Sequence, residues 1–162
     1  MAEVFRMQRR VAWRDTDWVG VICYPNIFHY FDDCENEFFR AHGVSKVDLY
    51  HKDEMFFPRI AANAEFKSML KYDDEITTEL RVYRLGEKSV GFAYRCYRDA
   101  DGVLAAEGST LLCLVNRQGT SIPIPRRLRD FFELYLEDAA RDGSPAQDAS
   151  AGAAGGGERQ TS

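Results

Sequence analysis

Two aspartates stand one residue apart in the segment RDTDWVGVICYPN, residues 14–26, which is otherwise suited to burial. Proline is favoured at the first position of a helix, where its missing N–H costs nothing, so Pro25 predicts that a helix starts here. Asp15 and Asp17 then lie in a loop that leads directly into a helix N-terminus. The segment therefore brings carboxylates close to the positive end of a helix dipole.

This arrangement suits acyl-transfer chemistry. The unpaired backbone N–H groups at a helix start favour negative charge, so they would stabilise a carbonyl oxygen that becomes an oxyanion. Asp17, across from that oxygen, could act as a nucleophile or as a general base for water. Gly20 would let another backbone approach closely. In an extended chain Asp15 points the other way, and we expect it to hold the loop in place.

Cysteine and metal chemistry fit the sequence less well. Cys23 lies near the helix start, but a nucleophilic cysteine needs a nearby base, and the closest histidine, His29, falls on the polar face of the helix. The four cysteines show no C-x-x-C spacing, and the three histidines show no ligand spacing. We therefore expect buried thiols, no disulfide, no metal site and no cofactor, in a cytoplasmic protein.

Residues 24–43 are predicted to form one long helix, and Gly43 suits the position just past its C-terminus. One apolar stripe recurs with helical spacing and consists of Ile27, Tyr30, Phe31, Cys34 and Phe38. Phe28, Glu35 and Phe39 widen this side of the helix. The pattern indicates a helix that is covered on most of its circumference.

The rest of the chain is rich in β-strand patterns. Residues 4–13 predict a strand ahead of the helix, and further strands are predicted at 56–68, 75–86, 89–99 and 103–116. Short turn signals between the later strands imply antiparallel pairing. A second helix is predicted from about Pro125 to about Asp138. One long early helix and about five antiparallel strands predict an α+β domain.

The long helix has too many apolar residues to lie on solvent, so the sheet should wrap around it, as in a hotdog fold. A single curved sheet leaves part of its surface uncovered, and we therefore expect a homodimer or homotetramer. The length of 162 residues fits one domain at 1–138, followed by a disordered Ala/Gly-rich tail at 139–162. The net charge of −5 does not indicate a nucleic-acid surface, and no run of 18 apolar residues predicts a membrane span.

The segment RVAWRDTDWVGVICYPNIFHYFDDC resembles the active-site segment of the 4-hydroxybenzoyl-CoA thioesterase family of hotdog enzymes. That pattern is a basic residue or Gln, an aliphatic residue, four residues, Thr or Cys, Asp, two residues, Gly and an aliphatic pair. It is filled here by Arg10, Val11, Thr16, Asp17, Gly20, Val21 and Ile22. The YPN that opens the helix and the YDD at 72–74 are also similar, and the resemblance extends over about residues 5–137.

The resemblance implies hydrolysis of an acyl-CoA thioester, with Asp17 as the catalytic carboxylate and the backbone N–H of Tyr24 polarising the thioester carbonyl. An aryl-CoA of the hydroxybenzoyl or benzoyl type is the favoured substrate, because of YPN, which includes Pro25, and of the aromatic helix face. Lys88 and Ser89 would lie near the nucleotide of CoA, and Arg59 is another candidate for its phosphates. The resemblance also implies an active site at a subunit interface.

Other functions are consistent with the same residues. The acyl group could be a short or medium aliphatic chain, and its carrier could be an acyl carrier protein, although an acidic surface does not favour an acidic partner. A hotdog hydratase would use an Asp–His pair, and the segment around Asp17 has no histidine within reach in sequence. A non-catalytic acyl-CoA-binding protein would need no carboxylate at position 17.

Overall fold

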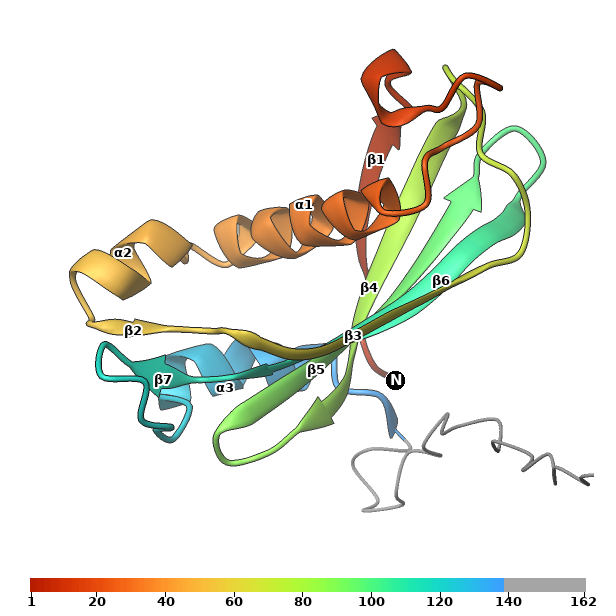
Figure 1. The fold of residues 1–162 in the computed structure, drawn as a ribbon. Coiled ribbons are helices and arrows are strands. Elements are labelled where there is room, and N and C mark those ends of the chain that lie inside the picture. Colours follow the sequence, from red (N-terminus) through yellow and green to blue (C-terminus); the bar gives the residue numbers. More distant parts are fainter. Residues whose placement is uncertain (139–162) are drawn as a thin grey trace, which may run out of the picture.

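We analysed a computed structural model of the chain, which describes residues 1–138; the predicted tail at 139–162 lies outside the described residues. Five strands form one antiparallel sheet in the order β1-β4-β5-β6-β3. Their bounds are Phe5–Arg10 for β1, Glu75–Leu85 for β4, Ser89–Arg98 for β5, Val103–Cys113 for β6 and Arg59–Phe66 for β3. The prediction of an α+β domain with about five antiparallel strands is confirmed (Figure 1).

Helix α1 (Asn26–Ala41) lies across one face of this sheet (Figure 1). The buried side of this helix is apolar except for the Glu35 carboxylate and the Tyr30 hydroxyl; its buried residues are Ile27, Tyr30, Phe31, Cys34, Glu35, Phe38 and Phe39. Close approach to β6 depends on Gly108, because a Cβ at that position would lie 2.7 Å from the Phe31 ring. The predicted stripe is therefore the buried side of the helix, and burial of each large side chain contributes about 1.5–3 kcal/mol.

A cluster of aromatic rings closes the core at the C-terminal end of α1. Helix α3 (Arg126–Leu134) contributes Phe131 and Phe132, whose rings lie 5.5 and 6.3 Å from that of Phe38. Phe92 of β5 lies 5.7 Å from Phe132 and thereby joins the sheet to both helices. Helix α3 starts beside Pro125 as expected, but it ends at Leu134, before the predicted end at Asp138.

Several predicted strand bounds were wrong. The strand predicted at 56–68 is two strands, β2 (Met55–Phe56) and β3, because Pro58 between them has no N–H to donate to a ladder. The strand predicted at 103–116 is likewise divided into β6 and β7 (Val115–Asn116), and β7 pairs with β2 in a separate small sheet.

A short helix, α2 (Lys46–His51), was not predicted. Ser45 caps it, since its side chain accepts a hydrogen bond from the backbone N–H of Asp48. With only six residues, the helix is too short to show a periodic apolar stripe. Strand β1 ends at Arg10, and a turn of 3-10 helix at Trp13–Asp15 leads into the segment that precedes α1.

Strand β3 forms one edge of the sheet, and seven of its eight residues are exposed. In the single chain its outer edge carries backbone N–H and C=O groups that pair with no other strand of the described residues. Within residues 1–138, no helix combines the length and the apolarity needed to cross a lipid bilayer.

Candidate active site

Asp17 occupies the base of a tight hairpin between β1 and α1. Its backbone N–H donates to the Val21 carbonyl at 2.8 Å, and the N–H of Gly20 donates to the Asp17 carbonyl at 2.9 Å. Gly20 has a φ of +82°, a conformation that other residues adopt only with strain. The glycine was expected to provide clearance, and nothing lies within 4 Å of a Cβ built on it. It also makes the turn possible.

The two oxygens of the Asp17 carboxylate have different surroundings. Oδ1 accepts hydrogen bonds from the backbone N–H of Val19 at 2.9 Å and of Val21 at 3.3 Å. Among the described residues, no hydrogen bond or ion pair involves Oδ2. The side chain is exposed, so this second oxygen is open to a reactant while the first holds the carboxylate in one orientation.

The hairpin is fastened to the loop that joins β3 to β4. The N–H of Ile22 donates to the Leu70 carbonyl at 2.8 Å, and the N–H of Tyr72 donates to the Gly20 carbonyl at 3.1 Å. The ring of Tyr72 packs edge-on against Trp13 with a centroid distance of 5.3 Å. These contacts fix the hairpin from the side of the sheet.

The N-terminus of α1 follows two residues after the hairpin. The N–H groups of Asn26, Ile27 and Phe28 donate to the carbonyls of Cys23, Tyr24 and Pro25, at 2.9, 3.4 and 3.2 Å. Pro25 has a helical φ of −66° and is the residue that caps the helix. The backbone N–H of Tyr24 has no hydrogen-bond acceptor within the part of the chain that the structure describes. One polar backbone donor is therefore free at the helix start.

The profile of the thioesterase-like superfamily matches residues 11–132, which include the hairpin, α1 and the sheet. The chain belongs to this superfamily. A candidate esterase of Aquifex aeolicus is 29% identical to it over 76% of the chain and 94% of the relative. The 4-hydroxybenzoyl-CoA thioesterase of Pseudomonas sp. strain CBS-3 is 26% identical over 55% of the chain and 64% of the relative.

The fold is that of hotdog thioesterases. The solved structure of a 1,4-dihydroxy-2-naphthoyl-CoA thioesterase from Synechocystis superimposes with a TM-score of 0.76, over 80% of this chain and 96% of that chain, at 15% identity. The predicted hotdog fold and the resemblance to the 4-hydroxybenzoyl-CoA thioesterase family are confirmed, and the protein is a thioesterase by family.

The candidates for CoA contacts do not gather around Asp17 in one protomer of this thioesterase-family protein. Lys88 lies in the turn from β4 to β5 and Ser89 begins β5, whereas Asp17 follows β1, whose C-terminal end pairs with the start of β4 at the opposite end of the sheet (Figure 1). The 11 residues of β4 separate the two ends by about 35 Å at the usual rise per residue. One ligand could contact both ends only if two protomers contributed to the same site.

Arg59 is already paired within the protein. Its guanidinium lies 2.5 Å from an oxygen of Asp32 and 2.9 Å from one of Glu35. Burial disfavours the charged guanidinium, but the Glu35 and Asp32 carboxylates outweigh this effect and raise the pKa of Arg59. A phosphate of CoA would have to compete with both carboxylates, so Arg59 is a weaker phosphate ligand than its charge suggests.

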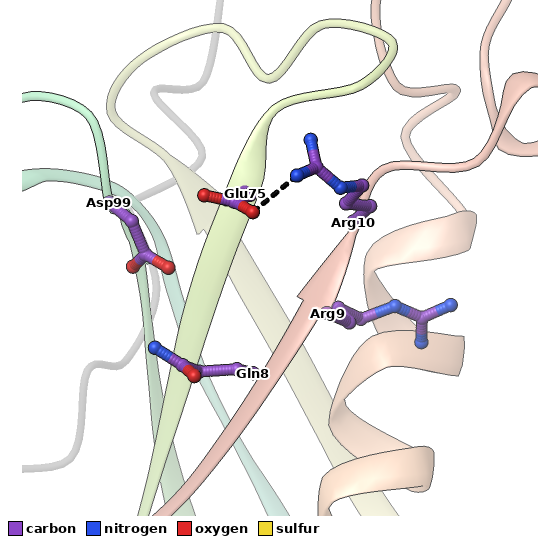
Figure 2. Close-up of a pocket in the computed structure, with 5 residues that line it drawn as sticks. All are labelled: Gln8, Arg9, Arg10, Glu75 and Asp99. Atoms are coloured by element: carbon purple, nitrogen blue, oxygen red, sulfur yellow. Dashed lines mark hydrogen bonds and ion pairs between the residues drawn. The ribbon is translucent and has the colours of Figure 1, made fainter.

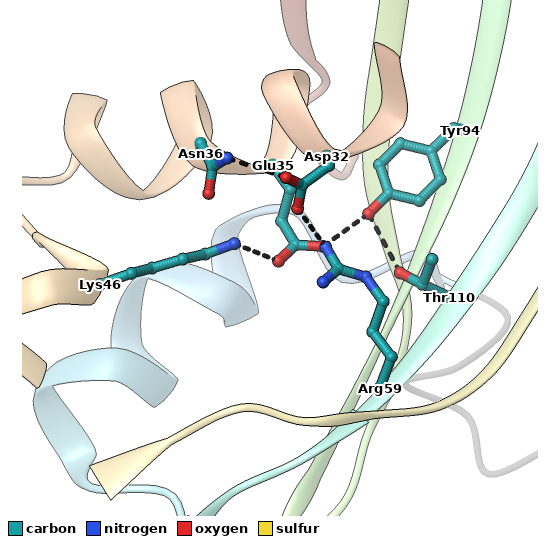
Figure 3. A network of polar contacts seen from close by, with 7 residues as sticks. All are labelled: Asp32, Glu35, Asn36, Lys46, Arg59, Tyr94 and Thr110. Atoms are coloured by element: carbon teal, nitrogen blue, oxygen red, sulfur yellow. Dashed lines mark hydrogen bonds and ion pairs between the residues drawn. The ribbon is translucent and has the colours of Figure 1, made fainter. Parts of the chain in front are cut away.

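Glu35 is a buried carboxylate whose polar network the sequence does not predict. Its side chain is 0% exposed, and it receives a 2.5 Å contact from Lys46 and a 2.9 Å hydrogen bond from the Tyr94 hydroxyl (Figure 3). The Tyr94 oxygen also lies 3.0 Å from Thr110. Burial and the Glu35 charge raise the pKa of Tyr94 well above its usual value, so its hydroxyl stays a donor. The signal in the sequence was a glutamate on the apolar side of a helix.

A surface hollow of about 290 Å³ is lined by Gln8, Arg9, Arg10, Glu75 and Asp99. Arg10 is paired with Glu75 across β1 and β4, and Figure 2 shows that Arg9 points toward α1, away from Gln8 and Asp99. Arg10 and Glu75 neutralise each other, Arg9 pairs with Asp33 outside the hollow, and Asp99 accepts a hydrogen bond from the Thr77 hydroxyl. This hollow is open and polar, and neither Asp17 nor the helix start contributes to it.

Proposed function

We propose that the protein hydrolyses acyl-CoA thioesters, with Asp17 as the reacting carboxylate and the backbone N–H of Tyr24 as the oxyanion donor. The observation that carries this proposal is that two polar groups without partners among the described residues, a carboxylate oxygen of Asp17 and the backbone N–H of Tyr24, lie in one short segment. The carboxylate has one oxygen held by backbone amides and one free, and the helix start has one amide without an acceptor. Such preorganised groups are what acyl transfer requires.

The reaction can follow two routes from this geometry. In the first, an Asp17 oxygen attacks the thioester carbon, the C–S bond breaks, CoA leaves as its thiolate, and water then cleaves the mixed anhydride to the free acid. In the second, Asp17 takes a proton from water, the hydroxide attacks the carbonyl carbon, and the proton passes to the departing sulfur. In both routes the negative charge develops on the carbonyl oxygen, where the Tyr24 N–H and the helix dipole would stabilise it.

We infer an aryl-CoA as the preferred substrate. Aromatic side chains lie open to solvent around the segment: Trp18 is 96% exposed, Tyr24 is 72% exposed, and Phe28, in the first turn of α1, is 38% exposed. Large apolar side chains are costly to leave in water, and a flat aryl group would cover them by stacking. The name of the Pseudomonas relative, a 4-hydroxybenzoyl-CoA thioesterase, supports the same inference.

We also infer that the active form is a homodimer or homotetramer. The open edge strand β3 can pair with a second copy, and Lys88 and Ser89 can serve the site of Asp17 only when they come from another protomer. Pro25, beside the free amide, would then border the acyl group. This arrangement would provide hydrogen-bond partners for the free edge of β3 and would cover the exposed aromatic rings.

The decisive experiment replaces Asp17 by asparagine. The Asp17→Asn variant keeps an oxygen that can accept the Val19 and Val21 amides, so the hairpin should persist while the charge is lost. We expect kcat for aryl-CoA hydrolysis, measured as released thiol, to fall by at least about a hundredfold. The matched control is Asp101→Asn, since Asp101 also accepts a backbone N–H two residues on, from Val103. Full activity of Asp17→Asn would exclude the proposed mechanism.

A panel of benzoyl-type, short-chain and long-chain acyl-CoA substrates tests the choice of acyl group. The aryl inference requires the highest kcat/KM for the aryl members. A preference for aliphatic chains would overturn that inference and leave the thioesterase mechanism in place. No hydrolysis of any member would overturn the mechanism and favour an acyl-CoA-binding role.

A further inference from the structure

Asp15 is bound differently from Asp17, although only one residue separates them. Its side chain is 14% exposed, and its Oδ2 accepts a hydrogen bond of 2.9 Å from the hydroxyl of Tyr30. Tyr30 lies on α1 and is 1% exposed. Burial, followed by the hydrogen bond to Asp15, raises the pKa of Tyr30, so the hydroxyl remains protonated and continues to donate. The contact therefore joins the hairpin to the body of the helix.

Arg9 completes this contact from β1. Its guanidinium carbon lies 3.8 Å from the centre of the Tyr30 ring, and its nitrogens lie 2.6 Å from Asp33 and 3.9 Å from Asp15. A guanidinium over an aromatic face is attractive, and the side chain is only 18% exposed, so the pair is partly desolvated. Strand, hairpin and helix thus meet at Arg9, Asp15 and Tyr30, which we call the Asp15 clamp.

The backbone of Asp15 closes the hairpin at its base. Its carbonyl accepts hydrogen bonds from the Cys23 N–H at 2.8 Å and from the Asn26 side-chain amide at 2.9 Å. The N–H that is held here belongs to residue 23, and the next one along the chain, that of Tyr24, is the free one. The Asp15 carbonyl thus ties the base of the hairpin to the residues on both sides of the free amide.

We propose that Asp15, with Tyr30 and Arg9, is a positioning residue that sets the place of Asp17 relative to the Tyr24 amide. This inference rests on the proposed function, because it assigns a purpose to that geometry. Asp15 does not touch the substrate; it acts through the hairpin. A shift of about 1 Å between catalytic groups can lower the rate about a hundredfold, so contacts that fix their relative position can affect the rate strongly.

The test removes the Tyr30 hydroxyl and compares the kcat of that variant with the kcat of a variant that lacks another buried tyrosine hydroxyl. Tyr30→Phe and Tyr94→Phe each delete one buried hydroxyl that donates to a carboxylate at 2.9 Å. We expect kcat of Tyr30→Phe to fall by about ten- to a hundredfold with KM nearly unchanged, while Tyr94→Phe keeps the wild-type kcat. Equal kcat values for the two variants, measured where both are folded, would overturn the proposal.

Conservative replacement separates positioning from general damage. Asp15→Asn retains an oxygen that can accept the Tyr30 hydroxyl, and Asp15→Ala does not. We expect Asp15→Asn to keep most of the wild-type kcat and Asp15→Ala to match Tyr30→Phe. An Asp15→Asn variant as slow as Asp15→Ala contradicts the proposed role of that hydrogen bond.

Hydrogen exchange gives a readout that needs no turnover. The amides of Asp17 and Cys23 close the hairpin, and that of Ile22 fastens it to the β3–β4 loop; all three should exchange faster in Tyr30→Phe than in Tyr94→Phe. Unchanged exchange there refutes the clamp even if the enzyme proves active. Full activity of Asp17→Asn, by contrast, would reject the proposed function alone, and the exchange result would still decide whether the clamp holds the hairpin.

Discussion

The buried carboxylate of Glu35 gives the sharpest test of what holds α1 to the sheet. Glu35→Gln keeps the shape of the side chain and an oxygen for the Tyr94 hydroxyl, but it removes the charge that pairs with Lys46 and Arg59. Loss of one partner from a buried ion pair costs about 3–5 kcal/mol. The Lys46 and Arg59 side chains are 31% and 37% exposed, so water can solvate them when they lose their partner.

This partial hydration lowers the expected cost to about 2–3 kcal/mol in the free energy of unfolding. For a domain of this size that corresponds to a fall in Tm of about 8–10 °C. Urea and thermal unfolding at pH 7, followed by circular dichroism, measure both quantities. The matched control is Glu37→Gln on the same helix, since Glu37 is 45% exposed and pairs with Arg40 at the surface.

A surface ion pair contributes little, and we expect Glu37→Gln to change the free energy of unfolding by less than about 0.5 kcal/mol. Two results would refute the reasoning. One is a Glu35→Gln variant whose stability lies within about 0.5 kcal/mol of wild type. The other is an equal loss in both variants, which would show that charge on the helix matters and the buried network does not.

Two further predictions concern pH and assembly. Burial raises the pKa of the Cys34 thiol from 9.0 to about 12 and that of Cys96 to about 11, so both bind their protons more tightly in the folded state. The stability that these protonated thiols contribute is complete below pH 9 and is lost at higher pH, where the unfolded chain releases their protons first. The free energy of unfolding in urea should therefore fall above pH 9 by up to about 1.4 kcal/mol per pH unit for each thiol. The fall should be less steep in Cys34→Ala. Light scattering should give at least twice the chain mass of 18.5 kDa, and Ala62→Pro, at an exposed position of β3 whose N–H faces the free edge, should lower it. A wild-type protein of single-chain mass contradicts the inferred assembly.

The sequence predicted the elements whose signals are local. The stripe on α1 and the turns between the later strands depend on neighbouring residues, and Gly43 indeed adopts a φ of +71° just past the helix. The short helix α2 escaped notice because six residues hold less than two turns of pattern. Pro58 was a visible break in the strand predicted at 56–68, and its missing N–H should have divided that strand.

The candidate site was predictable only in part, because some of the contacts around it join residues that are far apart in the sequence. Asp17, Gly20 and the helix start lie within one short segment, so their spacing could be interpreted directly. The partners of Glu35 come from three distant segments, at Lys46, Arg59 and Tyr94, and no local pattern connects them. The distance between Asp17 and the turn that contains Lys88 likewise depends on the direction of the strands.

Three of the carboxylates in this part of the chain, those of Asp15, Asp17 and Glu35, have different surroundings, which residue type alone does not reveal. Glu35 is fully buried, and both of its oxygens are bound, so it can contribute to stability and cannot reach a reactant. Asp15 is mostly buried and bound by a hydroxyl from the helix, which suits it to transmit position. Of these three, Asp17 alone combines exposure with a free oxygen, and this is the combination that a nucleophile or general base requires. The expected effects therefore differ: loss of charge at Glu35 should lower stability, loss of the Tyr30 hydrogen bond at Asp15 should speed exchange in the hairpin, and loss of charge at Asp17 should slow the chemical step.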